Sequence, residues 1–320
     1  MNKKLVALVI ICIIVVSYVA YNEYVVSQEL SGTIRISGAF ALYPLMVVWA
    51  QQYEKLHPKV TIEVSAGGAG KGMTDALAGL VDIGMISRQI SPTEIANGAF
   101  YVAVAEGAGV ATISASNPVL SDVLTQGFTK QVFYDIFVAG NVTSWGQALG
   151  LPDAVQYPIH VYTRSDAAGV ADTWAKFLGA KSQEDLKGIG VYADPGIVEA
   201  LKGDPLGIGY NNIAYAYDNS TGQQVSGIRV VPIDLNGNGK IDPQENFYST
   251  DAALIQAIEQ GKYPSPPAQD LYLVTKNKFT GVTKDFVTWI LTDGQPYVQQ
   301  SGLVPLSTDT INSQLAKLQS

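Results

Sequence analysis

Cysteine is almost absent from this chain of 320 residues, which contains a single one, Cys12. Cys12 lies in an apolar run near the amino terminus, so neither disulfide bonds nor thiolate metal sites support the rest of the chain. Histidine is nearly as rare: His57 precedes a proline at a predicted helix end, and His160 lies within a predicted strand. A serine-centred G-x-S-x-G elbow is also missing. These absences argue against a secreted hydrolase, and we expect the protein not to be an enzyme.

Charged residues are also sparse, at 15%, and acidic residues outnumber basic ones to give a formal net charge of −8. An acidic chain repels the phosphate backbone of nucleic acids, so we expect no nucleic-acid partner. The net charge does not prevent binding of a small anion, because local hydrogen-bond donors decide that. The length suffices for a large core and for two domains of ordinary size.

The longest apolar run lies at the amino terminus, where two lysines precede residues 5–21, a segment interrupted only by Ser17. This run is long for a signal-peptide core and short for a full membrane span. We favour an uncleaved membrane anchor with the lysines in the cytoplasm and the rest of the chain outside; cleavage after Ser17 is the alternative. Residues 1–31 are therefore predicted to be a signal or anchor segment with a polar spacer.

Strand and helix patterns alternate along the first part of the folded chain. The apolar spacing predicts strands at 32–38, 60–64 and 81–86, with a helix at 39–56 between the first two. This alternation predicts a mainly parallel sheet. Further along, the patterns predict helices at 128–137, 167–178, 284–291 and 296–300, and strands at 159–162, 207–210 and 270–275.

The segment from Val64 to Arg88 has the features of an anion-binding wall. A glycine-rich turn is followed by a predicted helix with Met73, Leu77 and Leu80 on one stripe. Backbone N–H groups at such a helix start, together with the helix dipole, favour a negative charge. The following strand would deliver a hydroxyl and a guanidinium to the same crevice. A plain helix–strand connection is the alternative, and the pattern departs from an NTPase P-loop at two required positions.

Residues 234–245, DLNGNGKIDPQE, match the twelve-residue calcium loop D-x-[DN]-x-[DN]-G-x-[ILV]-D-x-x-E throughout. The predicted ligands are Asp234, Asn236, Asn238, the carbonyl of Lys240, Asp242 and both carboxylate oxygens of Glu245. Calcium prefers about seven oxygens at flexible distances, which this set supplies. We therefore predict an EF-hand-like Ca²⁺ site with a structural or buffering role, because a strand pattern rather than a helix precedes it. A polar surface hairpin is the alternative.

Several passages, in the same order along the chain, resemble the phosphate-binding periplasmic protein family, the substrate-binding subunits of phosphate ABC importers. They are ISGAFALYPL, GGAGKGMTDALAGLVDIGMISRQIS, YDIFVAGNVTSW and YTRSDAAGVADTW, and the closing LYLVTK and DGQPYVQQSGLVPLS also fit. The resemblance implies a two-lobed α/β fold of the type II periplasmic-binding-protein kind, with the ligand in a cleft between the lobes. It places lobe 1 at 32–109 plus 276–320, and lobe 2 at 110–275 with the calcium loop inserted.

The resemblance also implies the residues of an oxyanion site. They are the backbone N–H groups of Phe40 and Ala41, the turn Ala69-Gly70, then Ser87, Arg88, Arg164 and the loop Ala168-Gly169-Val170. Asp166 would orient Arg164 through a charge-assisted pair. The alternative for these two residues is a surface ion pair of almost no energetic value. We expect Arg164→Ala to abolish anion binding and to leave the melting temperature within a few degrees.

This sequence departs from the family pattern where hydroxyl donors are typical, because Phe40, Ala69, Ala168 and Val170 occupy those positions. Each lost hydrogen bond to a charged ligand costs about 1.5–3 kcal/mol unless another donor replaces it. Either backbone amides, neighbouring hydroxyls and the arginines still hold phosphate, or the pocket takes another ligand. The resemblance implies an extracytoplasmic solute-binding protein that delivers phosphate or a related oxyanion to the membrane subunits of an ABC importer. The alternative is a surface-anchored structural or adhesive protein that has kept the fold.

Overall fold

The computed structural model of the protein describes residues 30–151 and 156–319. The predicted anchor segment, residues 1–31, lies outside these ranges except for its last two positions. Among the helices of the described ranges, none has the length and apolar character needed to cross a membrane.

Strands and helices alternate through the described chain, as the apolar spacing predicts. The strands are β1 Gly32–Gly38, β2 Val60–Ala66, β3 Ile83–Ile86, β4 Ala99–Ser114, β5 His160–Arg164, β6 Ile189–Val191, β7 Gly207–Asn212, β8 Ile228–Val230 and β9 Ala268–Lys276. The longer helices are α2 Tyr43–Leu56, α3 Ala69–Ala78, α8 Gly169–Leu178, α9 Ala193–Gly203, α11 Asp251–Glu259, α12 Gly281–Leu291 and α14 Thr308–Gln319. The shorter ones are η1 Phe40–Leu42, α4 Pro92–Ala96, α5 Leu120–Gln126, α6 Lys130–Tyr134, η2 Asp135–Ala139, α7 Trp145–Leu149, η3 Gln183–Asp185, α10 Ile213–Ala216 and α13 Pro296–Gln300.

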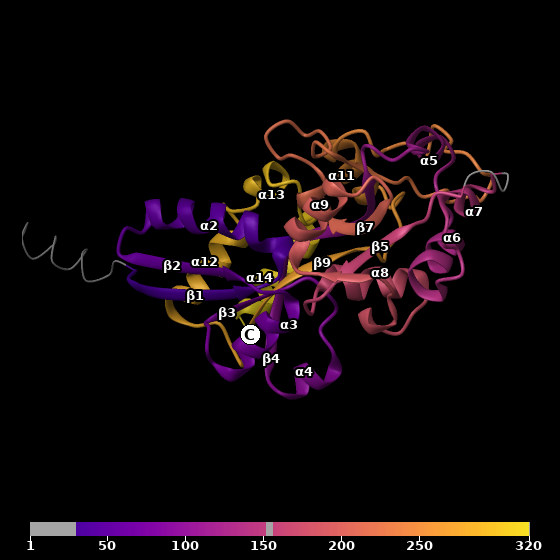
Figure 1. Ribbon diagram of the computed structural model, residues 1–320. Coiled ribbons are helices and arrows are strands. Elements are labelled where there is room, and N and C mark those ends of the chain that lie inside the picture. Colours follow the sequence, from indigo (N-terminus) through magenta and orange to yellow (C-terminus); the bar gives the residue numbers. More distant parts are fainter. Residues whose placement is uncertain (1–29, 152–155, 320) are drawn as a thin grey trace, which may run out of the picture.

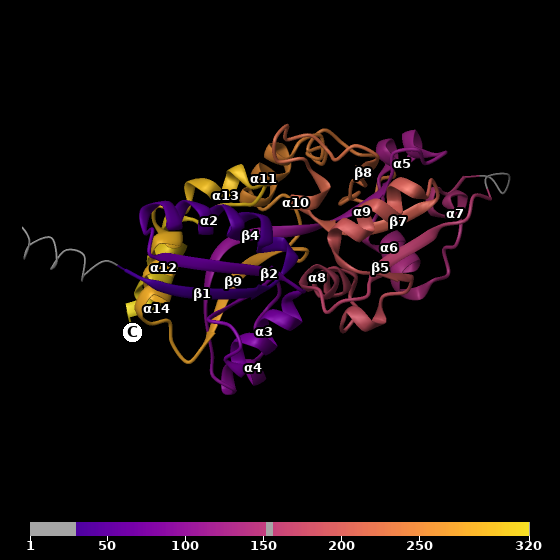
Figure 2. The ribbon, with the colours of Figure 1, turned by 60° about the vertical axis from the view of Figure 1, so that its left-hand side comes forward.

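These elements form two lobes that lie end to end (Figure 1). The first lobe contains β1, β2, β3, α2 and α3, and the carboxy-terminal helices α12 and α14 return to it. The middle of the chain, with β5, β7 and α6 to α9, forms the second lobe, and the separation is equally clear in the turned view (Figure 2). The chain therefore has the two-lobed α/β fold that the resemblance implies.

One sheet system of nine strands runs through both lobes, in the order β2-β1-β3-β9-β4-β7-β5-β6, with β8 also paired to β4. β1 is parallel to β2 and β3, and β5 is parallel to β6 and β7. The prediction of parallel pairing is thus confirmed inside each lobe. It fails at β4 and β9, which pair antiparallel with their neighbours because both carry the chain between the lobes.

The long strand β4 joins the two lobes directly. Its residues Ala99 to Ala108 pair with β9, and its residues Gly109 to Ile113 pair with β7 of the second lobe. Almost every position from Val102 onward is buried, which explains why this strand has a continuous apolar run instead of an alternating one. The division into lobes at 109/110 and 275/276 stays a prediction.

The helix after the glycine-rich turn is shorter than its apolar stripe predicts. α3 ends at Ala78, and Gly79 follows in the left-handed conformation with φ +70°. Such a glycine ends a helix because it supplies a backbone conformation that other residues adopt only at a cost. Leu80 consequently lies outside the helix and is 66% exposed, so its predicted place on the buried stripe is wrong.

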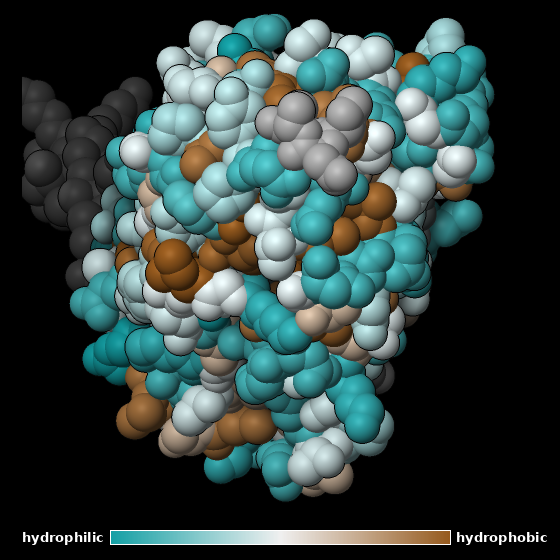
Figure 3. All heavy atoms as spheres, turned by 45° about the vertical axis from the view of Figure 1, so that its right-hand side comes forward, coloured by the Kyte–Doolittle hydropathy of each residue, from teal (hydrophilic) through white to brown (hydrophobic). Residues whose placement is uncertain are grey.

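An aromatic cluster in the second lobe fixes α8 against β7. The Trp174 ring lies 5.2 Å from the Phe133 ring and 6.0 Å from the Tyr210 ring, measured between centroids. Trp174, Phe133 and Tyr210 are fully buried. The outer face of the second lobe carries a band of apolar side chains among polar ones (Figure 3). Because the cluster holds α8 against β7, the start of α8 lies in a fixed position at the cleft.

Candidate ligand site in the cleft

Three helical segments begin where the two lobes meet: η1 at Phe40, α3 at Ala69 and α8 at Gly169. The first N–H groups of a helix have no partner within it, so each start presents backbone donors to the same place. One small pocket at this point collects residues from both lobes, namely Phe40, Gly68, Ala69, Ser87, Arg164, Ala168, Gly169, Val170 and Asn212. The structure thus brings together most of the residues that the resemblance implies.

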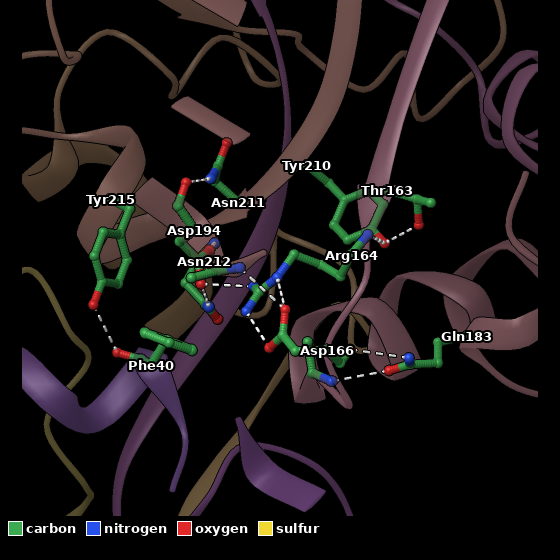
Figure 4. A network of polar contacts seen from close by, with 12 residues as sticks. Phe40, Thr163, Arg164, Asp166, Gln183, Asp194, Tyr210, Asn211, Asn212 and Tyr215 are labelled. Carbon is green, nitrogen blue, oxygen red and sulfur yellow. Dashed lines mark hydrogen bonds and ion pairs between the residues drawn. The ribbon is translucent and has the colours of Figure 1, made fainter. Parts of the chain in front are cut away.

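Arg164, at the end of β5, is the charged centre of this pocket. Its Nε and Nη2 donate to the two carboxylate oxygens of Asp166 at 2.8 and 2.7 Å, and its Nη1 donates to Asp194 at 2.7 Å (Figure 4). The side chains are 1%, 6% and 0% exposed, respectively. The alternative of a surface ion pair is therefore wrong. Burial acts to lower the pKa of Arg164, but the Asp194 and Asp166 carboxylates outweigh it and raise the pKa.

Asp194 is the residue of this cluster that sequence reasoning missed. It lies in the first turn of α9 and accepts hydrogen bonds from the backbone and side-chain nitrogens of Asn212, at 2.8 and 3.0 Å. Thirty residues separate Asp194 from Arg164. The sequence around Asp194 contains no motif that would link it to a distant arginine, so only the fold reveals this pair.

Tyr210 holds the backbone of β5 in place behind the arginine. Its hydroxyl is 2.7 Å from that of Thr163 and accepts a hydrogen bond from the backbone N–H of Arg164 at 3.2 Å. Burial raises the pKa of Tyr210 to about 12, so the hydroxyl stays protonated. The two contacts of the Tyr210 hydroxyl fix the end of β5 and therefore the direction in which the Arg164 side chain points.

Arg88 does not reach the pocket. Its guanidinium forms a two-point contact with Glu94, at 2.6 and 3.0 Å, and Glu94 also caps α4 together with Ser91. With Gly70, Arg88 lines a neighbouring cavity of about 170 Å³ that faces η3. The capping-box pattern from Ser91 to Glu94 predicts the start of α4, but it does not predict that Glu94 also pairs with Arg88.

Direct contacts between the lobes close the cleft. The N–H of Gly70 donates to the carbonyl of Ala167 at 3.1 Å, and the Tyr215 hydroxyl donates to the carbonyl of Phe40 at 3.1 Å. The Phe40 ring covers the guanidinium of Arg164, whose central carbon lies 5.4 Å from the ring centroid. The residues around this point leave no space large enough for a water molecule.

Two implied residues lie at the margin of the pocket. Ala41 is buried within η1, one position beyond Phe40, and Asp166 lies behind Arg164, where it also accepts a hydrogen bond from the backbone of Ala193. A larger cavity of about 470 Å³ lies outside this pocket and shares no lining residue with it. It is lined by Gln89, Thr173, Lys176, Ser265, Pro266, Ala268, Gln269, Asp270 and Tyr272. The role of the implied residues in binding an anion stays a prediction.

The match to known proteins extends over most of the chain. A family model described as the PBP superfamily domain matches residues 26–294. The chain belongs to the PBP superfamily. It is 25% identical to the phosphate-binding protein PstS of Methanocaldococcus jannaschii, over 96% of this chain and 93% of that protein. It is also 25% identical to PstS of Bacillus subtilis, over 88% and 83% of the two chains.

A solved structure agrees with this assignment at the level of the fold. A proposed phosphate ABC transporter substrate-binding protein of Clostridium perfringens, determined with bound phosphate, superposes with a TM-score of 0.68. It is 23% identical and covers 86% of this chain and 100% of its own. The resemblance to phosphate-binding periplasmic proteins drawn from the sequence is thereby confirmed.

In this member of the PBP superfamily, the 234–245 loop forms a second polar centre, far along the chain from Arg164. Asp234 accepts hydrogen bonds from the backbone of Gly237 and Gly239 at 2.8 and 2.9 Å, and Glu245 accepts three more from the backbone of the loop. Both carboxylates are buried, at 4% and 3% exposure. The N–H of Ile241 donates to the carbonyl of Thr125 at 2.9 Å and ties the loop to α5.

Asp242 faces the loop from its outer side. Its carboxylate binds the Lys240 ammonium at 2.9 Å and the side-chain amide of Asn238 at 2.8 Å. The hydrogen bonds from Lys240, Asn238 and Asn236 lower the pKa of Asp242. Within residues 30–151 and 156–319, no group of three or more His, Cys, Asp or Glu side chains is arranged so that it could hold a metal ion. The calcium site therefore stays a prediction.

Proposed function

We propose that the protein is an extracytoplasmic solute-binding protein that captures phosphate or a related oxyanion for an ABC importer. The observation that carries this proposal is the position of Arg164, a buried cation at the point where three helical segments begin. Helix starts and a fixed guanidinium together favour a tetrahedral anion. The curated relatives named as phosphate-binding proteins support the choice of ligand. The proposal assigns binding and transport, not catalysis, to this site.

Binding requires the lobes to separate and close again around the ligand. The contacts that must open are those of Gly70 with Ala167 and of Phe40 with Tyr215. The donors available to an oxyanion are then the first N–H groups of η1, α3 and α8, the Ser87 hydroxyl and the Arg164 guanidinium. Backbone donors replace the hydroxyls that this sequence lacks. A backbone N–H group held in a fixed direction binds an anion whatever the side chain of its residue is.

Isothermal titration of the full chain with phosphate, arsenate, sulfate and molybdate tests the proposal. We expect saturable binding of phosphate or of another member of this set, with one ligand per chain. The matched control is Arg35→Ala, which removes an arginine whose side chain is 62% exposed, and its binding should equal that of the wild type. Absence of heat with all four anions would contradict capture of an oxyanion.

A structural or adhesive role is the second candidate function. It is favoured by the tight contact of the two lobes at Arg164 and by the apolar residues at four positions where hydroxyls are typical of the family. In this case the closed cleft would be the permanent state of the protein. Small-angle scattering in the presence and absence of each anion separates the two functions, since only a capturing protein changes shape with its ligand.

We also propose that the 234–245 loop binds Ca²⁺ and that the amino-terminal segment attaches the protein to the membrane. Calcium binding is supported by the carboxylates and amide oxygens at alternate positions of the loop, because Ca²⁺ prefers such oxygen ligands. Backbone hydrogen bonds already fold it around Asp234 and Glu245. Calorimetric titration of chelator-treated full chain with calcium chloride should give one site in the range of extracellular calcium. Absence of binding at millimolar calcium would mean that the loop is only a hairpin.

Cell fractionation, with and without residues 1–29, tests attachment of the protein to the membrane.

A further inference from the structure

We propose that Asp194 competes with the ligand for Arg164 and thereby determines the affinity of the cleft for anions. This inference rests on the proposed function, because it concerns the same site. The Asp194 carboxylate contacts Nη1 of Arg164 at 2.7 Å, on the side of the guanidinium that Asp166 leaves open. An anion arriving at that side meets a carboxylate that already occupies it.

The charges around Arg164 oppose an added anion. One guanidinium faces two carboxylates, Asp166 and Asp194, which leaves a net charge of −1 in a region that excludes water. A further negative charge would be repelled in this low-dielectric surrounding, where charges interact more strongly than in water. The ligand therefore gains full access to the guanidinium only after one carboxylate has given up its contact.

Asp194 is the carboxylate that can give up that contact at lower cost. It keeps two hydrogen bonds from Asn212 when Arg164 moves away, and it lies in the first turn of α9, where the helix dipole favours a negative charge. Asp166 instead holds two nitrogens of the guanidinium at once and also accepts the N–H of Ala193. Two parallel hydrogen bonds make that pair the stronger one.

Asn212 links the competitor to the pocket. It lines the same pocket as Arg164 and Phe40, and its side-chain amide donates to Asp194 at 3.0 Å. Phe40 covers the guanidinium from the first lobe, so in the closed cleft its ring lies against Arg164 while Arg164 is paired with Asp194. The contact of Asp194 with Arg164 thus takes the place of the anion in the closed form.

The test compares the full-length wild type with Asp194→Asn, which keeps the shape and one acceptor oxygen for the backbone N–H of Asn212 but removes the charge and the second acceptor oxygen. The control is Glu199→Gln, which makes the same change of charge on α9, where Glu199 is 71% exposed and pairs with Lys202 at 2.8 Å. Each protein is titrated calorimetrically with inorganic phosphate and with sulfate at low ionic strength. We expect Asp194→Asn to bind at least one of them about tenfold more tightly than the wild type, and the control to match the wild type.

Thermal unfolding supplies a second measurement. Asp194→Asn loses the charge-assisted hydrogen bond to Nη1 of Arg164, although Asp166 still pairs with the guanidinium, so the variant should melt below the wild type in chloride buffer and recover in phosphate of equal ionic strength. Recovery should exceed any rise seen for the wild type and for Glu199→Gln. A variant that is unfolded in chloride and refolds on addition of phosphate would support the proposal equally, whereas one that stays unfolded would contradict it.

The outcomes separate this inference from the proposed function. Equal anion affinities in the wild type and Asp194→Asn would overturn the role of Asp194 while leaving oxyanion capture intact. Binding by the variant alone would support the role of Asp194 and would contradict capture by the natural chain. Absence of binding and of thermal recovery in both proteins would overturn both.

Discussion

The Arg164 cluster and the 234–245 loop place buried carboxylates in opposite situations. In the cluster, Asp166 and Asp194 face a guanidinium from the same chain. In the loop, Asp234 and Glu245 accept only backbone N–H groups, and Lys240, which pairs with Asp242, is the single cation of the twelve residues. The cluster therefore has an internal cation and keeps a net charge of −1, whereas the loop retains a net charge of −2 that an external cation would neutralise.

Removing the guanidinium should produce the largest effect. Arg164→Ala leaves Asp166 and Asp194 buried without their counter-charge, and loss of one partner of a buried pair costs about 3–5 kcal/mol. Because the cluster is buried, this replaces the sequence-based expectation of an almost unchanged melting temperature. Denaturant unfolding measures the free energy difference. Arg35→Ala is the control, because Arg35 and Glu63 are both more than 60% exposed and lie 3.7 Å apart.

The control pair should lose less than about 1 kcal/mol, as exposed ion pairs do. Equal losses for Arg164→Ala and Arg35→Ala would show that the buried cluster contributes no more than a surface pair. Pairing with Arg164 would then add nothing to the free energy of unfolding beyond what an exposed ion pair adds.

Calcium should stabilise the loop by the next largest amount. At a concentration a hundred times the dissociation constant, a ligand of the folded state adds about 2.7 kcal/mol to the free energy of unfolding. We expect the wild type to melt higher in calcium than in EGTA, and Glu245→Gln to lose most of this difference because it loses a charged ligand. Glu199→Gln is the control, since Glu199 is 71% exposed and pairs with Lys202 outside the loop. A calcium response that survives in Glu245→Gln would place the ion elsewhere.

The sequence predicted the parts of both centres that depend on neighbouring residues. The resemblance implied the pairing of Arg164 with Asp166, two positions apart, and the structure contains this pair. The twelve-residue pattern predicted the calcium loop, whose metal binding stays a prediction. Asp194 and Asn212 reach Arg164 only through the order of strands in the second lobe. The fold class followed from the alternation of strands and helices and from the resemblance, but the antiparallel placement of β4 and β9 depends on long-range pairing that periodicity does not encode. The resemblance implies Arg88 as a site residue, whereas in the structure its guanidinium pairs with Glu94 of α4.

Glycines in the two centres should respond differently to an added methyl group. At Gly169 a Cβ would overlap the Ser87 hydroxyl and carbonyl oxygens across the cleft, so Gly169→Ala should hold the lobes apart. Gly239 has φ +78° and no atom within 4 Å of an added Cβ, so Gly239→Ala should cost only the left-handed conformation, about 1–2 kcal/mol. Small-angle scattering should show a larger radius of gyration for Gly169→Ala alone. An unchanged radius for Gly169→Ala would mean that the lobes adapt locally.

Glu106 and Asp270 provide a third case, carboxylates that face one another on the strands that join the lobes. They lie directly opposite in the pairing of β4 with β9. Burial raises the pKa of Glu106, and the charges of Asp270 and Glu259 raise it further. Burial also raises the pKa of Asp270, although a hydrogen bond from Tyr272 acts against this. Like charges in this position destabilise a sheet, by an amount on the order of 0.2–1 kcal/mol.

Glu106→Gln should therefore stabilise the protein, and the gain should depend on pH. A carboxyl whose pKa is raised by folding binds its proton more tightly in the folded state, so stability falls as pH rises from the unfolded value, about 4.3 for glutamate, through the raised folded value. The penalty is absent below the unfolded value and complete above the folded one. We expect Glu106→Gln to unfold at higher denaturant concentration at pH 7.5, with the gain vanishing near pH 4. Glu63→Gln, on strand β2 with a side chain that is 63% exposed, is the control and should show no such gain. A gain at Glu106 that is the same at both pH values would assign the effect to packing and not to charge.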